Sequence, residues 1–143
     1  MIRKADPKDY PAAAALAARM WEHESEELAQ GFAEADAAGE GAVFVAEESG
    51  QIVGFAQCGL RHDYVEGTES SPVGYLEGVY VDEACRRRGY AAQLLSACES
   101  WAKEKGCREF ASDCELTNTG SLNFHLSLGF QEANRIICFT KKL

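Results

Sequence analysis

The sequence predicts an α+β fold in which a mixed sheet carries helices on both faces, in a three-layer α/β/α arrangement. Three observations predict it. Short strand-like segments alternate with helical segments along the chain, and the helix after Gly89 has a single apolar stripe. The 143 residues suffice for one hydrophobic core but not for two domains. We therefore expect one domain over residues 1–143, without repeats or linkers.

The N-terminal quarter is expected to contain a short strand and two helices. Residues Ile2–Ala5 form the strand-like run, and Asp6-Pro7 then supplies an N-cap and a proline for the first helical turn. This helix is predicted to extend to about Met20. A second helix is predicted over Ser25–Ala38.

Three strands are expected next. Val43–Glu48 and Ile52–Leu60 are joined by Ser49-Gly50, which is a hairpin signal. A polar loop over residues 62–73 then leads to a strand over Tyr75–Val81.

The second half of the chain continues with a helix, a strand, a helix and a strand. The helix after Gly89 ends at Gly106, and its apolar residues are spaced to form one buried stripe: Ala91, Leu94, Leu95, Cys98, Trp101 and Ala102. A strand is expected near residues 108–113 and a helix near 119–128. A last apolar strand is predicted from about Asn134 to Lys141.

A basic loop, Arg86–Ala91, comes after the strand predicted to end at Val81 and opens a long helix. The first amides of a helix are unpaired and lie at the positive end of its dipole, and Gly89 lets the backbone approach a phosphate closely. Three consecutive arginines add charge suited to a pyrophosphate. The Rossmann and Walker A glycine patterns are both absent. The alternative interpretation is a solvated basic turn that caps an ordinary helix.

The pattern Arg86-x-x-Gly89-x-Ala91 resembles the acyl-CoA pyrophosphate loop of the GCN5-related N-acetyltransferases. The later segment Asn118–Phe130, with its Gly-Phe end, resembles the second signature of that family. Two signatures in the right order are more specific than one. The resemblance implies the acyl-CoA N-acyltransferase fold, with a mostly antiparallel central sheet whose strands splay apart, and acetyl-CoA as co-substrate without a metal.

The resemblance also implies which residues hold acetyl-CoA. The strand before the loop would pair with the pantetheine arm, the loop amides would bind the pyrophosphate, and an asparagine would contact the arm. These positions are Val79, Tyr80, Val81, Arg86, Arg87, Arg88, Gly89, Tyr90, Ala91, Ala92 and Asn118. Core packing is the alternative role of the two valines.

The excess of negative over positive charge is confined to one half of the chain. Residues 1–75 contain five basic and fourteen acidic residues, whereas residues 76–143 contain nine of each. An acidic surface attracts polycations and repels nucleic acid, although acidic helices also serve solubility alone.

Several segments resemble the aminoglycoside 6′-N-acetyltransferases: Met20-Trp21, residues 61–78, Phe110–Asp113 and residues 138–142. The resemblance implies an aminoglycoside acceptor that is acetylated on its 6′-amine by direct attack in a ternary complex, which confers resistance. Trp21 and Tyr64 would face sugar rings, and Glu77 and Asp113 would bind ammonium groups. Glu24 and Asn134 are further candidates for contacts with the acceptor.

Catalysis requires a proton acceptor, because an amino sugar is mostly protonated at neutral pH and only the free amine attacks. Glu77 and Asp113 are the candidates, either as bases or as groups that position the amine. A backbone N–H near Val79 is a candidate for polarising the thioester carbonyl. His125 lies where many family members have a tyrosine. It is a candidate acid toward the thiolate, and the alternative is a packed, hydrogen-bonded histidine.

Two other functions remain open at this stage. The same fold could acetylate another cationic amine, such as a polyamine, a protein lysine or an N-terminus, or it could be an acyl-CoA sensor without catalysis. The six cysteines contain no Cys-x-x-Cys pair, so we expect free thiols. No apolar run is long enough to span a membrane and no apolar signal core is found, so a cytoplasmic protein is expected. The resemblance to the aminoglycoside enzymes also implies a homodimer, with Ile136, Ile137 and Phe139 as interface candidates; ordinary sheet core is the alternative role of these residues.

Overall fold

The computed structural model describes residues 1–143 and contains one open sheet with the strand order β1-β2-β3-β4-β5. The strands are β1 (Ile2–Lys4), β2 (Gly41–Glu48), β3 (Gln51–Arg61), β4 (Val73–Val81) and β5 (Phe110–Ala111). All neighbours are antiparallel except β4 and β5, which are parallel. This confirms the predicted mixed, mostly antiparallel sheet.

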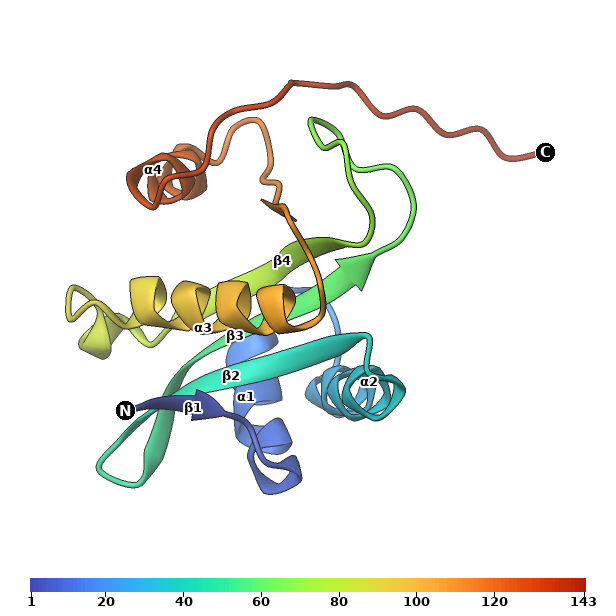
Figure 1. Ribbon diagram of the computed structural model, residues 1–143. Coiled ribbons are helices and arrows are strands. Elements are labelled where there is room, and N and C mark those ends of the chain that lie inside the picture. Colours follow the sequence, from blue (N-terminus) through green and yellow to red (C-terminus); the bar gives the residue numbers. More distant parts are fainter.

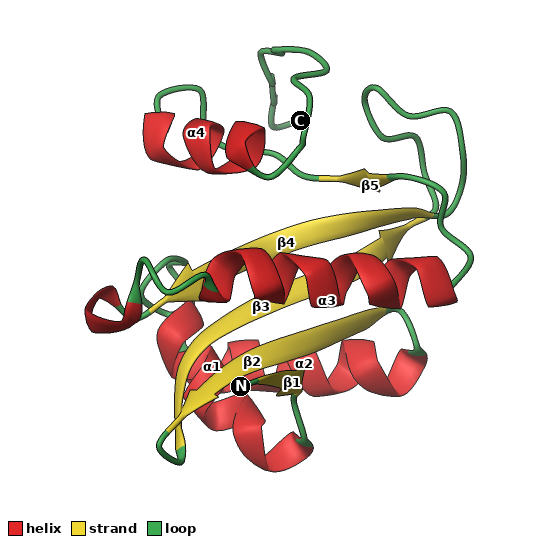
Figure 2. Cartoon of the chain, turned by 60° about the vertical axis from the view of Figure 1, so that its left-hand side comes forward, coloured by secondary structure: helices red, strands yellow, loops and turns green.

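Three of the four α-helices cover the two faces of the sheet, so the molecule has three layers (Figures 1 and 2). Helices α1 (Tyr10–Ala17) and α2 (Ser25–Ala38) pack on one face, and α3 (Tyr90–Glu104) packs on the other. Helix α4 (Thr119–Ser127) lies beyond β4 and β5. Two short 3₁₀ helices, η1 (Pro7–Asp9) and η2 (Glu83–Cys85), precede α1 and α3.

The core is divided by the sheet because successive strand residues point to opposite faces. On the α3 face, Ala42, Ala46, Ala56, Cys58 and Leu76 pack against Leu94, Leu95, Cys98 and Trp101. On the opposite face, Val43, Val45 and Phe55 pack against Ala13, Ala17 and Phe32. The alternation within β2 and β3 therefore explains why each helix layer finds an apolar surface.

Three predicted elements differ from the structure. The first helix ends at Ala17 instead of Met20, and β5 is shorter than the strand predicted over residues 108–113. The last predicted strand, Asn134–Lys141, is wrong: these residues have no assigned strand and run as an exposed tail (Figure 1). A strand needs a hydrogen-bonded neighbour, and none lies beside the tail. No helix is long and apolar enough to cross a membrane.

Strands β4 and β5 separate soon after they meet. They pair only at Gly74 with Phe110 and at Tyr75 with Ala111. The rest of β4, from Leu76 to Val81, has no strand on that side. The splayed sheet that the resemblance implies is therefore present. The candidate site residues Glu77, Val79, Tyr80 and Val81 lie along this open part of β4.

Candidate active site

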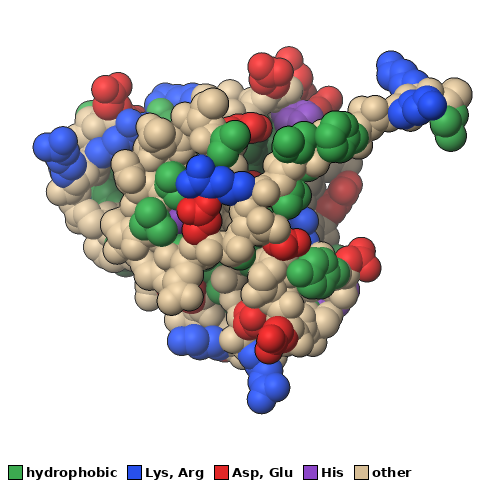
Figure 3. Space-filling view, turned by 90° about the horizontal axis from the view of Figure 1, so that it is seen from above, with side chains coloured by type: hydrophobic (Ala, Val, Ile, Leu, Met, Phe, Trp, Pro, Cys, Tyr) green, Lys and Arg blue, Asp and Glu red, His purple; other side chains and the backbone are tan.

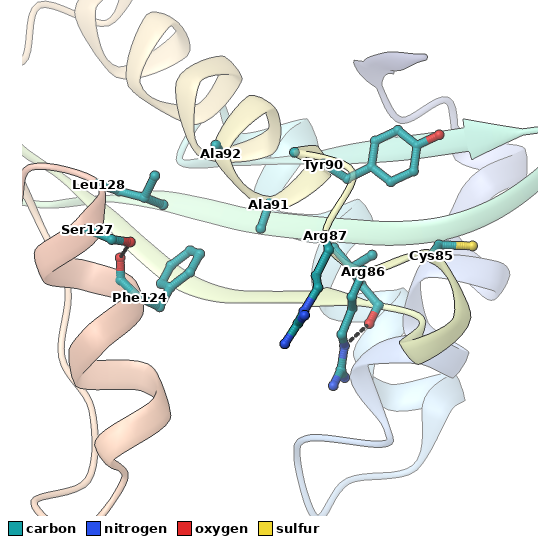
Figure 4. A pocket seen from close by; sticks show the side chains of 11 residues that line it. Cys85, Arg86, Arg87, Tyr90, Ala91, Ala92, Phe124, Ser127 and Leu128 are labelled. Carbon is teal, nitrogen blue, oxygen red and sulfur yellow. Dashed lines mark hydrogen bonds between the residues drawn. The ribbon is translucent and has the colours of Figure 1, made fainter.

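A pocket of about 250 Å³ lies between the start of α3 and helix α4. It is lined by Val81, Cys85, Arg86, Arg87, Gly89, Tyr90, Ala91, Ala92, Phe124, Ser127 and Leu128. Figure 4 shows the arginine loop on one side and α4 on the other, with the side chains of Arg86 and Arg87 extending into the space between them. A site with free helix amides, basic side chains and an apolar wall suits a ligand that has both phosphates and an apolar arm.

The backbone of this loop is shaped for close approach. Gly89 is the N-cap of α3 and has a φ of 81°, in the left-handed region that favours glycine. Arg87 also has a positive φ, of 65°. Because no side chain caps the helix end at Gly89 with a hydrogen bond, the first amides of α3 are left for an anion.

The three arginines of the loop make different contacts. Arg86 donates through Nε to the carbonyl of Val81 at 2.8 Å and lies over the ring of Tyr80. Arg88 forms an ion pair with Glu48 of β2 and does not line the pocket. Arg87 has no ion pair. Arg87 is therefore the arginine most available to a phosphate.

Glu48 fixes the loop from the β2–β3 hairpin. Its carboxylate accepts hydrogen bonds from Tyr90 Oη, at 2.8 Å, and from Arg88. These two hydrogen bonds hold the pKa of Glu48 below its usual range, and the bond from Tyr90 has the larger effect. The contact ties the start of α3 to the sheet.

Seven of the predicted acetyl-CoA residues line this pocket, namely Val81, Arg86, Arg87, Gly89, Tyr90, Ala91 and Ala92. Four others do not: Val79, Tyr80, Arg88 and Asn118. Asn118 is the N-cap of α4 and accepts a hydrogen bond from Ser121 N at 3.0 Å. Four further lining residues were not predicted from the sequence: Cys85, Phe124, Ser127 and Leu128. The spacing of Phe124 and Leu128, four apart on one helix face, was the available signal.

Glu77 occupies a bulge in β4. Gln57 of β3 is paired with Gly78 and Cys58 with Leu76, so Glu77 is the extra residue without a partner. A bulge redirects a side chain and bends the strand. The Glu77 carboxylate, 30% exposed, forms an ion pair with Arg61 of β3 through three N–O contacts of 2.7, 3.0 and 3.1 Å.

Tyr75 and Asp113 form the second part of this polar cluster. The buried Tyr75 donates its hydroxyl hydrogen to Asp113 Oδ2. Burial is the main cause that raises the pKa of Tyr75, and the hydrogen bond to Asp113 raises it further. The guanidinium carbon of Arg61 lies 4.0 Å from the centroid of the Tyr75 ring. Arg61 and Tyr75 thus connect Glu77 and Asp113, the two carboxylates that the sequence analysis selected.

His125 on α4 is hydrogen-bonded through both ring nitrogens. Nδ1 lies 2.6 Å from the carbonyl oxygen of Ser121, so this nitrogen carries a hydrogen and donates. Nε2 lies 2.8 Å from Ser112 Oγ, which is itself 3.3 Å from the carbonyl oxygen of Leu76. The ring also packs against Phe124 and Phe130. These contacts match the packed histidine that was the alternative to a catalytic one.

Four of the predicted acceptor residues lie in four different places. Trp21 packs on β4 at Gly78, on the α1 and α2 face. Tyr64, 77% exposed, lies in the loop between β3 and β4. Glu24 is exposed at the N-cap of α2, and Asn134 in the tail donates to Glu66 Oε1 at 2.9 Å. Trp21 alone among these four touches the strand that carries Glu77.

A larger pocket, of about 790 Å³, lies between β5, α4, the loop before β4 and the start of the tail. Tyr75, Asp113, His125 and Asn134 line it together with acidic residues that include Glu66, Glu109 and Glu115. Its lining has six acidic side chains against three basic ones, Lys103, Arg108 and Arg135, and this excess of negative charge suits a polycation. No group of three or more His, Cys, Asp or Glu side chains is placed to hold a metal ion.

The fold and the pocket define the class of protein. The family model described as "Acetyltransferase (GNAT) family" matches residues 3–130, and the chain belongs to this family. It is 44% identical to the aminoglycoside N(6′)-acetyltransferase type 1 of Stenotrophomonas maltophilia over 99% of this chain and 93% of that protein.

Two solved structures show the same architecture over the whole chain. The apo aminoglycoside 6′-N-acetyltransferase AAC(6′)-IG of Acinetobacter haemolyticus superposes with a TM-score of 0.92 at 36% identity, covering 100% of this chain and 99% of that one. The structure of AAC(6′)-Iy in complex with the bisubstrate analog CoA-S-monomethyl-acetylneamine has a TM-score of 0.91 at 37% identity, covering 100% and 98%.

Proposed function

We propose that this protein transfers the acetyl group of acetyl-CoA to the 6′-amino group of aminoglycoside antibiotics and thereby confers resistance to them. The observation that carries the proposal is the arrangement along β4. Val81 lines the anion pocket at the start of α3, and Glu77 projects from a bulge four residues earlier on the same strand. The names of the relatives, of which one was solved with a CoA-aminoglycoside bisubstrate analog, support the acceptor class.

The residues at the start of α3 fit coenzyme A. The exposed helix end at Gly89 suits the pyrophosphate, Arg87 adds a free guanidinium, and Phe124 and Leu128 give an apolar wall for the pantetheine arm. The open edge of β4 leaves backbone groups for that arm. When bound, acetyl-CoA supplies the acetyl group as an activated thioester.

On the acceptor side, Glu77 and Asp113 do the chemistry that the amine requires. An ammonium group must lose a proton before its nitrogen attacks, and a carboxylate within hydrogen-bond reach accepts that proton directly or through a water molecule. Both carboxylates also attract the other charges of the amino sugar. The acetyl group passes directly to the amine in a ternary complex. Trp21, on Gly78, offers a flat apolar face to a sugar ring.

A substrate panel tests this function. Release of free coenzyme A is measured with kanamycin, tobramycin, spermidine and a lysine peptide at equal concentrations. We expect turnover with the two aminoglycosides and little with the others. Turnover confined to spermidine or the peptide contradicts the acceptor, and binding of acetyl-CoA without turnover on any amine indicates a sensor.

We also propose that the protein works as a homodimer in the cytoplasm, where acetyl-CoA is available and the six free thiols stay reduced. Ile136, Ile137 and Phe139 are 66, 79 and 87% exposed in a tail that stands clear of the body (Figures 1 and 3). Apolar residues on an unpaired extended segment favour association with a second copy. Light scattering after gel filtration should give a dimer, and a variant truncated after Ala133 should be monomeric.

A further inference from the structure

Arg61 poses a question that the proposed function does not answer. It places a positive charge on the carboxylate that is expected to receive the ammonium group of the acceptor. Its Nη2 lies 2.7 and 3.0 Å from the two oxygens of Glu77, and its Nε lies 3.1 Å from Oε1. Both oxygens of Glu77 are therefore already engaged by a cation of the protein itself.

Arg61 is also linked to the second carboxylate, Asp113, through Tyr75. Its guanidinium lies over the ring of Tyr75, at 4.0 Å, and the hydroxyl of Tyr75 binds Asp113. The hydrogen bonds to Glu77 are the main cause that raises the pKa of Arg61. The negative charge of Asp113 adds a smaller effect in the same direction. One guanidinium thus pairs with Glu77 and also feels the charge of Asp113, the two proposed acceptor carboxylates.

This arrangement is open to displacement. The side chains of Arg61 and Glu77 are 46 and 30% exposed, and ion pairs of this kind stabilise a fold only weakly. Arg61 is the last residue of β3, so its side chain can turn toward the loop over residues 62–72 without disturbing the sheet. A ligand that brings its own positive charges to Glu77 can compete with it.

We propose that Arg61 is a specificity residue that acts as an internal competitor of the acceptor. It neutralises Glu77 in the free enzyme and leaves when an ammonium group of the acceptor takes its place. A monoamine replaces the positive charge of Arg61 with a single positive charge of its own, so it gains little binding free energy. A polycation reaches Glu77 and Asp113 together and therefore gains more binding free energy. Arg61 thus selects for multiply charged acceptors. This inference rests on the proposed function of the same site.

Equilibrium binding tests the inference without catalysis. Calorimetry measures the Kd of tobramycin for the wild-type protein and for Arg61→Gln, in the absence of acetyl-CoA. We expect Arg61→Gln to lower the Kd about 5-fold, because the pair with Glu77 no longer has to be broken. Arg61→Lys restores a competing charge and should return most of the wild-type Kd. In steady-state assays the gain should appear in KM more than in kcat.

A matched control separates competition from general charge. Lys4→Gln removes one positive charge from an ion pair of similar exposure, Lys4 with Asp36 at 2.9 Å, on β1 at the other edge of the sheet. It should leave the Kd of tobramycin unchanged. In the background of Glu77→Gln, the change Arg61→Gln should bring no further gain.

Three results would overturn the inference: unchanged or weaker binding by Arg61→Gln, an equal gain from Lys4→Gln, or a gain that persists in the Glu77→Gln background. Wild-type protein that acetylates tobramycin while Arg61→Gln binds it no more tightly contradicts the inference alone. Wild-type protein that neither binds nor acetylates tobramycin contradicts the proposed function and the inference with it.

Discussion

Trp21 packs directly on the backbone of Gly78. A Cβ atom built on Gly78 would lie 2.4 Å from Cζ2 and 2.7 Å from Cη2 of the Trp21 ring, far inside contact distance. The ring is also held edge-on against Phe55, with centroids 6.1 Å apart. The absence of a side chain at residue 78 therefore lets a large aromatic ring lie beside the β4 bulge at Glu77.

Gly78→Ala should displace Trp21. We expect a loss of about 1–3 kcal/mol in the free energy of unfolding, as for other overpacked sites, and a higher KM for aminoglycosides. Denaturant unfolding and the tryptophan fluorescence spectrum check this. Gly31→Ala in α2 is the control, since nothing lies within 4 Å of its Cβ position, and it should stabilise the protein by about 0.5–1 kcal/mol. A normal spectrum and KM for Gly78→Ala would contradict the role of this contact.

Glu77→Gln and Asp113→Asn keep the shape of each side chain and remove its charge. We expect each to lower kcat/KM for tobramycin about 10²-fold or more, because a proton acceptor and an ammonium partner are lost. The KM for acetyl-CoA should stay near the wild-type value, since neither residue lines the pocket at α3. Full aminoglycoside turnover by both variants would refute the site assignment.

Arg87→Ala and Arg88→Ala should differ although the residues are neighbours. Arg87 lines the α3 pocket without an ion pair, whereas Arg88 is engaged by Glu48. We expect Arg87→Ala to raise the KM for acetyl-CoA about 10-fold, in line with the loss of one charge-assisted bond. Arg88→Ala should have a smaller effect. Equal effects of the two substitutions would show that the pairing with Glu48 does not determine which arginine meets the phosphates.

Asp9 links stability to pH. It accepts two bonds from Arg3, at 2.6 and 3.1 Å, and one from the amide of Asp6 at 2.8 Å. Arg3 is the main cause that lowers the pKa of Asp9 from its ordinary value of 3.8. A carboxylate with a lowered folded-state pKa stabilises the protein above its unfolded-state pKa, and this contribution is lost as the pH falls through the folded-state pKa.

Asp9→Asn should therefore lower the free energy of unfolding by about 2–3 kcal/mol at pH 7. The difference from wild type should shrink as the pH falls below 3.8. Urea unfolding at several pH values measures both. A difference that stays constant down to acid pH would contradict the assignment to the charge of Asp9.

Local patterns predicted the fold where the contacts that stabilise an element are close in sequence. The helix over Ser25–Ala38 was predicted with the bounds that the structure has, and it ends at a C-cap glycine, Gly39, with a positive φ of 72°. The hairpin between β2 and β3 follows Ser49-Gly50 in the same way. The strand over Asn134–Lys141 failed because an apolar alternation specifies a strand only when a neighbouring edge is present to pair with it.

The site was predictable in its residue types but not in its pairings. Gly89, Arg87 and Glu77 were selected from motifs; Gly89 and Arg87 line the pocket at α3, and Glu77 lies in the bulge of β4. The engagement of Arg88 by Glu48 joins residues 40 apart in the chain, and that of Glu77 by Arg61 depends on the register of β3 and β4. Such long-range pairs follow from the packed sheet and leave no local pattern in the sequence.

The most direct test of the account is a crystal structure of the protein with coenzyme A and tobramycin bound together. The account predicts the pyrophosphate on the amides at the start of α3, within residues 87–92, and the 6′-nitrogen facing Glu77 or Asp113. Coenzyme A bound away from α3 and β4, or a 6′-nitrogen far from both carboxylates, would contradict it.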